Sequence, residues 1–418
     1  GYEDPCYSAI LDYISEKKLE DKEKQEVMKI AGVLKPLRKK DSPHFGSHCI
    51  QSIEYIFGQK ISSTGRQMLQ DKFDIGLNSN RNLFETVRLI GQGYNILSDK
   101  SVAAQVVHFD SFGMKYGMVI PTCAKIEDVQ QSKSFMEILD DQKSYTKERL
   151  KGLNVNLDVK PDIFKMGLKA GYNMKSSSTT SSSRSEYSFL FEQRLFELKI
   201  GNYKECLNHG MTFTEDFKSD VAELPSKYKK ENQICVSKFT RFFNRFGHFM
   251  VSSAYAGGSI EAKCSREAVD STKTSLADAK ACLAATLEGW DVAEANLSAE
   301  RSTSDSSKSK ALLLRSAYSW AGGDVDFHTN GSIGDKERLK KWKESLKETP
   351  VMLTSELTLE PISTAVKYVN PDKDQAVYDA LRDLLVAKGF LYYLRAFLEK
   401  IKKVFTREET IVEPFLGN

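Results

Sequence analysis

The sequence has no apolar run long enough for a transmembrane helix, which needs ~18 or more consecutive apolar residues. It also has none of the short motifs that mark common enzymes, since HExxH, GxSxG, GxGxxG and the phosphate-binding P-loop are all absent. The amino terminus shows no basic region followed by an apolar region, so we expect the chain that starts at Gly1 to be a processed or recombinant form. These absences predict a protein that is soluble at first, is not an enzyme and carries no cofactor.

An excess of charge of one sign is missing as well. The 418 residues include 60 basic and 57 acidic side chains, so the formal net charge is only +3. Nucleic-acid-binding proteins carry a strongly basic face, and we therefore expect no nucleic-acid partner. Short basic clusters such as Lys229-Lys230 are expected to be solvated helix ends, with contact to anionic lipid headgroups as the alternative.

Cysteines are few and dispersed. There are seven, without a CxxC pair or the ligand spacing of a zinc finger, so no metal site is expected. Dispersed cysteines suit a secreted protein with a few disulfides, and Cys264 and Cys282 are a candidate pair. Buried free thiols in a cytosolic protein are the alternative. Asn296 and Asn330 each begin a glycosylation sequon.

The first distinctive segment spans residues 164–200. Apolar and polar residues alternate there with a period of two, which predicts β-strands with one apolar and one polar face. The apolar positions are Phe164, Met166, Leu168, Ala170, Tyr172 and Met174 in the first arm and Tyr187, Phe189 and Phe191 in the second. Ser and Thr residues fill 176–183 between the arms, and a later change of phase predicts a β-bulge near Gln193. We predict an amphipathic hairpin, each arm having about the ~9–11 residues that a tilted strand needs to cross a bilayer. An ordinary strand pair packed on a core is the alternative.

A second segment, from about 264 to 320, repeats this plan. Leucines at helical spacing predict that its first arm is helical in the soluble protein, namely Leu276, Leu283 and Leu287. Residues 296–310 are mostly polar. Apolar residues of one parity then follow, at Leu312, Leu314, Tyr318 and Trp320. The first arm is compatible with either helix or strand, and this ambiguity is the useful observation.

The carboxyl-terminal part predicts a long amphipathic helix. Asn370 is its expected N-cap and Pro371 its first residue. Apolar residues recur along one face at Val377, Leu381, Leu384, Leu391, Leu394, Leu398, Ile401 and Phe405. Residues 1–80 also read as helical, and residues 406–418 as a tail or linker.

Between the two amphipathic segments lies the stretch Phe246-Gly247-His248-Phe249, followed by Gly257-Gly258. It resembles the signature of the membrane-attack-complex/perforin (MACPF) family, which has an aromatic residue, Gly, Thr or Ser, His, a second aromatic residue, six residues and Gly-Gly. Aligned without a gap, His248 takes the Thr/Ser position and Phe249 the His position. Adjacent glycines weaken a strand unless its backbone bends or approaches another chain closely. Gly257 and Gly258 are therefore a candidate hinge, with a plain turn as the alternative.

Three further stretches resemble parts of the same family. Residues 91–97 resemble the Gly-x-Gly-Tyr stretch with which the family's domain often opens. Residues 319–324 resemble the Gly-Gly turn after its second insertion segment. The series Trp342, Ser345, Pro350 and 357–362 resembles its Trp–Ser–Pro–Leu-Glu-Pro-Ile ending. The resemblance covers roughly residues 85–405.

The resemblance implies an α+β fold. Its features are a bent, twisted four-stranded antiparallel sheet and two flanking helical clusters, to which this chain adds an N-terminal helical extension. The expected organisation is a helical extension at 1–80, a MACPF domain at 81–405 and a tail at 406–418. Each helical cluster of the family refolds into a membrane-crossing hairpin, so the apolar positions of both segments are implied to face lipid in a pore.

The resemblance also implies partners and location. Family members assemble into a ring or arc on a target membrane, through a lipid or receptor, and are secreted and soluble until they bind it. Two alternatives remain open at the sequence level. One is a non-lytic MACPF scaffold or adhesion protein, and the other is the pore subunit of a toxin whose targeting module is a separate chain.

Overall fold

The structure is a computed structural model, and it describes Asp21 and residues 85–96, 100–138, 186–265, 315–328 and 336–386. Its strands are β1 (Gly93–Asn95), β2 (Lys100–Ser101), β3 (Val107–Phe109), β4 (Phe112–Lys115), β5 (Met118–Pro121), β6 (Lys125–Ile138), β7 (Glu186–Lys199), β8 (Met211–Phe213), β9 (Phe249–Ser265), β10 (Arg315–Ala321) and β11 (Val351–Pro361). Its helices are η2 (Thr86–Arg88), α7 (Tyr203–Asn208), α8 (Glu215–Glu223), α9 (Gln233–Phe246), η4 (Val325–Phe327), α13 (Lys336–Ser345), α14 (Ser363–Val369) and α15 (Asp374–Val386). The predicted extension at 1–80 and tail at 406–418 lie outside this description, apart from Asp21.

One seven-stranded antiparallel sheet organises the described chain, beside two two-stranded sheets formed by β3 with β8 and by β4 with β5. β7 lies between β6 and β9 and is paired with both along nearly its whole length. On the other side of β9, β11 pairs with residues 249–257 and β10 with residues 259–265. Four strands therefore lie abreast through the long part of the sheet, while β1 and β2 extend it beyond the start of β9. The predicted α+β class and antiparallel sheet are confirmed.

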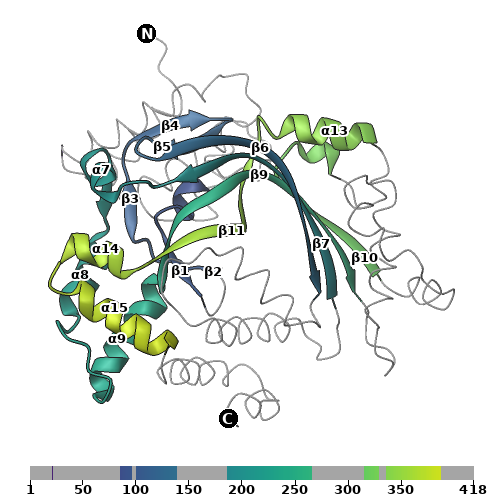
Figure 1. Cartoon of the computed structure of the whole chain (residues 1–418). Coiled ribbons are helices and arrows are strands. Elements are labelled where there is room, and N and C mark those ends of the chain that lie inside the picture. The colour runs from purple at the N-terminus through teal and green to yellow at the C-terminus, as the bar shows by residue number, and fades with distance from the viewer. Residues whose placement is uncertain are drawn as a thin grey trace, which may run out of the picture.

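The long strands bend sharply about halfway along their length (Figure 1). Pairing loses its regular register between Asp128 and Gln131 of β6, between Arg194 and Phe196 of β7, and between Leu353 and Leu357 of β11. Extra residues on one strand of a pair bend that strand and increase its twist. The irregularities lie at one level of the sheet, because Gly257 of β9 pairs with Arg194 and Arg194 with Gln131. The bulge predicted near Gln193 is thus confirmed close to that residue.

Helices α8, α9, α14 and α15 form a group at one end of the sheet, opposite α13 in the view of Figure 1. Helix α9 begins after Asn232, whose side chain accepts hydrogen bonds from the N–H groups of Ile234 and Cys235 at 3.0 and 3.1 Å. Its inner face buries Phe239, Phe242, Phe243 and Phe246. Of these, Phe242 and Phe246 pack on Phe217 of α8. The phenylalanine-rich packing ties the helices to the sheet edge at β1.

The carboxyl-terminal helix is confirmed in part. Val377, Leu381 and Leu384 are buried on one face of α15, as the periodicity predicts. The N-cap prediction is wrong, because α15 begins at Asp374. Asn370 instead ends α14, donating its N–H to the Val366 carbonyl at 2.8 Å, and its side chain accepts the N–H of Asp372 at 3.1 Å. An Asn side chain stabilises a turn as readily as a helix start. The predicted stripe from Leu391 to Phe405 lies outside the described residues.

One disulfide, Cys123–Cys206, links the loop after β5 to α7. The candidate pair Cys264–Cys282 is not tested, because Cys282 lies outside the described residues, as do the sequons at Asn296 and Asn330. Cys235 is a buried free thiol. Among the described helices, none is both long and apolar enough to cross a membrane.

Candidate functional site at the bend of the central sheet

The first half of the signature forms the junction between α9 and β9. Gly247 ends α9 with a φ of 87°, a value that favours glycine. On the neighbouring strand, a Cβ atom on Gly93 would lie 1.7 Å from the Phe246 carbonyl oxygen, so only glycine fits. The N–H of His248 donates to the Tyr94 carbonyl at 3.0 Å. The Gly-x-Gly-Tyr stretch and the signature, far apart in sequence, are therefore in direct backbone contact.

His248 is a fully buried part of this junction. Its Nδ1 accepts the Ile96 N–H at 3.3 Å, and its ring stacks on Phe243 with the centroids 5.6 Å apart. Its carbonyl accepts the N–H of Ile362 at the end of β11. Burial lowers the pKa of His248 to about 3, so the imidazole is neutral near pH 7. Its role in this structure is to join β1, α9 and β11.

Acid is expected to weaken this junction. The folded-state pKa of about 3 lies below the unfolded value of about 6.5, so between these pH values the unfolded chain binds a proton that the folded chain does not. The free energy of unfolding should therefore fall as the pH falls, by about 2 kcal/mol between pH 7 and pH 5. In urea unfolding at the two pH values, His248→Asn keeps an acceptor near Nδ1 but should lose less stability on acidification than the wild type. Equal losses would contradict this assignment.

The second half of the signature lies where the sheet bends. A Cβ atom on Gly257 would lie 1.9 Å from the carbonyl oxygen of Gln193 on β7. A Cβ atom on Gly258 would lie 2.3 Å from Leu346 and 2.9 Å from the Ala321 carbonyl oxygen. Both glycines are thus required by close approach, Gly257 to the next strand and Gly258 to the segment after α13. The plain-turn alternative is wrong, because both residues lie within β9.

The two remaining stretches of the resemblance meet at this bend. The indole N–H of Trp342, a fully buried residue of α13, donates to the Gly322 carbonyl at 3.0 Å. Gly322 and Gly323 both have positive φ, and a Cβ atom on Gly323 would lie 2.5 Å from the Trp342 indole nitrogen. Trp320 packs edge-on against Trp342 at 5.4 Å. Helix α13 is therefore seated on the glycine turn beside the bend.

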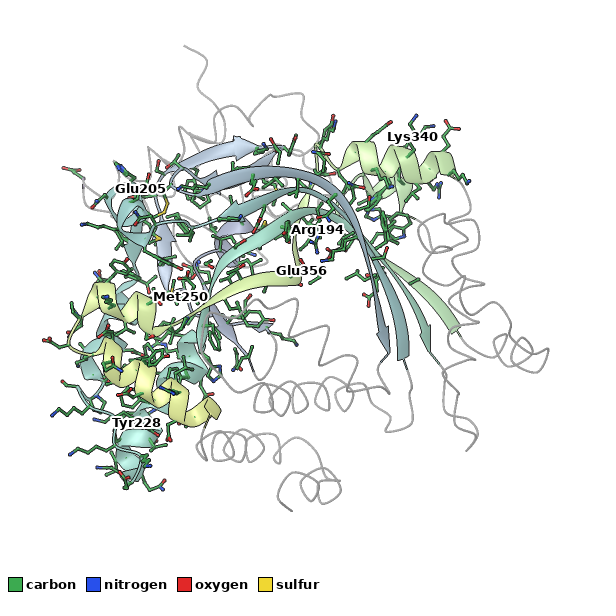
Figure 2. All side chains as sticks on the ribbon, viewed as in Figure 1. Arg194, Glu205, Tyr228, Met250, Lys340 and Glu356 are labelled. Carbon is green, nitrogen blue, oxygen red and sulfur yellow. A yellow bond between two sulfur atoms is a disulfide. The ribbon has the colours of Figure 1, made fainter. Side chains whose placement is uncertain are left out.

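A buried ion cluster crosses the sheet at the same level. Arg194 of β7 is 1% exposed and contacts Glu192 and Glu356, each at 3.0 Å. Its guanidinium lies over the Tyr255 ring of β9, 4.2 Å from the centroid. Lys133 of β6 also pairs with Glu356, which lies in the irregular part of β11. Figure 2 shows Arg194 and Glu356 close together where the sheet turns. One cluster thus ties β6, β7, β9 and β11 together.

The two carboxylates of this cluster differ in acidity. Burial raises the pKa of Glu192, although the hydroxyl of Ser355 and the charge of Arg194 oppose that shift. Burial also acts to raise the pKa of Glu356. Hydrogen bonds and charges from Lys133 and Arg194 outweigh it, so the pKa of Glu356 lies below its ordinary value. Glu356 is therefore the carboxylate that the two basic residues hold ionised.

Few of the residues predicted to face lipid are described with their side chains. Phe191 is fully buried, and the Lys343 ammonium lies 5.1 Å from its ring centroid, so α13 covers this position. Burial also lowers the pKa of Lys343. Trp320 packs against Trp342 and stacks on His328 at 5.4 Å. Tyr187 and Phe189 lie in β7 and Tyr318 in β10. The other predicted positions lie outside the described residues: Phe164, Met166, Leu168, Ala170, Tyr172, Met174, Leu276, Leu283, Leu287, Leu312 and Leu314.

The structure gives β7 different neighbours from those of the predicted hairpin. Both edges of β7 are occupied, one by β6 up to the pair Ile138–Tyr187 and the other by β9 up to the pair Glu186–Ser265. β7 therefore has no free edge for the partner that the sequence predicted, and residues 164–174 themselves lie outside the described residues. Each long segment instead connects two strands that are already paired. Residues 139–185 join β6 to β7, and residues 266–314 join β9 to β10, whose pairing reaches Ser265–Arg315.

Sequence reasoning missed the ion cluster. Glu192 and Arg194 are two residues apart in a strand and therefore lie on one face, where opposite charges attract. That signal was available, but Glu356 lies more than 160 residues away, and nothing local in the sequence pairs it with Arg194. No group of three His, Cys, Asp or Glu side chains within the described ranges is placed to hold a metal ion.

The family model of the MAC/Perforin domain matches residues 69–389. GNIP1Aa from Chromobacterium piscinae is 14% identical, with 71% of this chain and 55% of that chain covered and a TM-score of 0.44. A protein with a MAC/Perforin domain from Bacteroides thetaiotaomicron is 14% identical, with 73% and 63% covered and a TM-score of 0.39. Astrotactin-2, a perforin-like vertebrate membrane protein, is 14% identical, with 73% and 46% covered and a TM-score of 0.36.

The chain covers less than two thirds of the length of each of these structures. No curated protein matches the sequence.

Proposed function

The chain belongs to the MAC/perforin family, whose model matches well over half of it, and from this premise we propose that it is a pore-forming protein. It oligomerises on a target membrane and inserts two amphipathic β-hairpins per protomer into one large barrel. The observation that carries this proposal is the placement of residues 139–185 and 266–314. Each segment begins and ends on neighbouring antiparallel strands, so extending it lengthens a strand pair that already exists.

The order of the strands supports insertion of both segments together. The sheet runs β6, β7, β9, β10 at the end where the segments leave it, and β7 is paired with β9 as far as Glu186–Ser265. Two hairpins grown from these ends would lie side by side with their inner edges paired. Each segment supplies arms longer than the ~9–11 residues that a tilted strand needs to cross a bilayer.

Extrapolating the pairing of the sheet also predicts where each proposed hairpin turns. Continued without a bulge from Ile138–Tyr187, the pairing joins Leu150 to Lys175 and turns at Asp162-Ile163, directly after Pro161. From Ser265–Arg315 it turns near Gly289-Trp290. Proline, aspartate and glycine are favoured in turns. These tips differ from the Ser-rich stretches at 176–183 and 296–310, which then belong to the returning arms.

Insertion requires several protomers. An unpaired strand edge in lipid leaves N–H and C=O groups unsatisfied, at several kcal/mol each. In the described sheet β6 pairs with β7 alone and β10 with β9 alone, so each protomer presents two edges that a neighbour can complete. Closure of the ring removes those edges. Secretion is part of the proposal, and the Cys123–Cys206 disulfide supports it because such bonds persist in oxidising compartments.

The test is release of a trapped dye from liposomes. The wild type is expected to release dye, whereas a variant with an Asn-Gly turn between Ile138 and Tyr187 in place of residues 139–186 is expected to bind without release. The turn is feasible because those two residues are already paired. A full-length variant, Met166→Lys with Leu168→Lys, should also lose release, since a charge on the lipid-facing side costs about 2–4 kcal/mol at mid-bilayer.

Two further readouts complete the experiment. Thermal unfolding checks that each variant is folded before it is compared. Leu150→Cys with Lys175→Cys should form a disulfide in pores and so report the continued register. Binding without release by the wild type, on every membrane tried, would contradict pore formation and favour a non-lytic scaffold or a missing partner chain.

A further inference from the structure

The connection between α8 and α9, together with the first residues of α9, carries a local excess of positive charge. Residues 224–241 contain five basic side chains and one acidic side chain, a net charge of +4, whereas the whole chain has only +3. The basic residues are Lys227, Lys229, Lys230, Lys238 and Arg241. All five are exposed, and none forms an ion pair with another described residue. We call these residues, together with Ile234, the basic tip.

Ile234 gives the basic tip an apolar point. It is 73% exposed, the most exposed of the large apolar side chains described. It lies on the same face of α9 as Lys238 and Arg241, because helical residues four and seven positions apart are aligned. The opposite face of α9 is buried, so Ile234 contributes nothing to the core. An exposed isoleucine among cations is typical of a surface that meets both lipid headgroups and the outermost acyl carbons.

The basic tip is held in place by its own packing. The Tyr228 ring packs edge-on against Phe239 at 5.4 Å, and its hydroxyl donates to Asp383 of α15 at 2.6 Å. The N–H of Asn232 donates to the Lys229 carbonyl at 3.1 Å, and the Asn232 side chain caps α9. The lysines therefore project from backbone that is already ordered, so less conformational entropy is lost when they bind a partner.

The position of the basic tip agrees with the geometry of insertion. In the view of Figure 1, the lower end of α9 and the free ends of β6, β7 and β10 point to the same side of the molecule. A membrane that contacts the basic tip would face those strand ends. An acidic polypeptide would satisfy the lysines equally well, but it gives no reason for Ile234 and no relation to the strand ends.

We infer that the basic tip binds anionic lipid headgroups and so orients the protein on its target membrane. The inference rests on the proposed function for its biological meaning. Lys227, Lys229, Lys230, Lys238 and Arg241 contact headgroup phosphates or carboxylates, and Ile234 enters the interface. The partner class is an anionic phospholipid surface.

The test is co-flotation of the full-length protein with phosphatidylcholine vesicles that do or do not contain phosphatidylserine. The wild type should bind the anionic vesicles more strongly, and salt should weaken that binding. Lys229→Gln with Lys230→Gln should reduce affinity about 25-fold, because a basic residue near an anionic surface is worth roughly fivefold. Ile234→Ser should reduce it about tenfold, with little change in salt dependence.

A matched control removes the same charge elsewhere. Lys340 and Lys347 are exposed residues at and beyond α13, and Lys340→Gln with Lys347→Gln should leave binding unchanged. Equal losses in both double variants would overturn the inference, because net charge alone would explain binding. Binding of poly-glutamate but not of anionic vesicles would also overturn it and assign the tip to an acidic polypeptide. Dye release is measured separately, so release with an irrelevant tip refutes only this inference, and tip-dependent binding without release refutes only pore formation.

Discussion

Replacing Gly257 by alanine is expected to prevent the central sheet from forming. The new Cβ atom would lie 1.9 Å from the Gln193 carbonyl oxygen and 3.0 Å from the Arg194 Cα atom. Both neighbours are backbone atoms of β7, so no side-chain rotation relieves the overlap. β7 and β9 would have to separate in the middle of their shared ladder. We expect the free energy of unfolding to fall by roughly 4 kcal/mol or more.

Urea unfolding followed by circular dichroism measures this effect. The matched control is Gly113→Ala in β4, where a Cβ atom meets nothing within 4 Å. That change should alter stability by no more than about 0.5 kcal/mol, as surface substitutions usually do. If Gly257→Ala unfolds at nearly the wild-type urea concentration, the close approach of β7 does not require glycine at position 257. The role of Gly257 at the bend would then need another explanation.

Replacing Arg194 by methionine is expected to have the second largest effect. Methionine fills much of the same volume but leaves Glu192, which is 2% exposed, without its cation. Glu356 would retain only Lys133. Removing one partner of a buried ion pair typically costs 3–5 kcal/mol, because the other charge stays buried and uncompensated. We expect a loss of about this size in urea unfolding at neutral pH.

Two further variants show whether stranded charge is the cause. Lys199→Met on the same strand removes a cation that is 41% exposed and paired with Glu127 and Glu197, and it should cost at most about 1 kcal/mol. Combining Arg194→Met with Glu192→Gln and Glu356→Gln should recover much of the lost stability. A triple variant no more stable than Arg194→Met would show instead that packing of the guanidinium on Tyr255 matters most.

The ion cluster has a consequence for the proposed insertion of hairpins. Straightening the bend would alter the irregular part of β11 that holds Glu356 against Lys133 of β6 and Arg194 of β7. Helix α13, seated on Gly258 and over Phe191, would also have to move if the sheet straightened beneath it. The bend is therefore held by the ion cluster and by the packing of α13, and both act on β7 and β9.

The sequence by itself determined the family and several local features. Glycine is the residue type that tolerates close backbone approach and unusual φ values. The glycines at 247, 257 and 258 therefore indicate such features in the sequence itself. The helical spacing of Val377, Leu381 and Leu384 is enough to predict that these side chains are buried on one face. The bulge near Gln193 was visible as a change of phase. These are local properties, which a linear pattern records directly.

Only the tertiary structure decided which segments lie together. β7 pairs with β6 and β9, which the local alternation did not predict, because strand pairing is set by the whole sheet and not by the nearest alternating stretch. The Cys123–Cys206 bond and the contact of Arg194 with Glu356 join residues 83 and 162 positions apart. No period or motif encodes such distances. The proposed hairpins extend from paired strand ends, and those ends exist only once the sheet has formed.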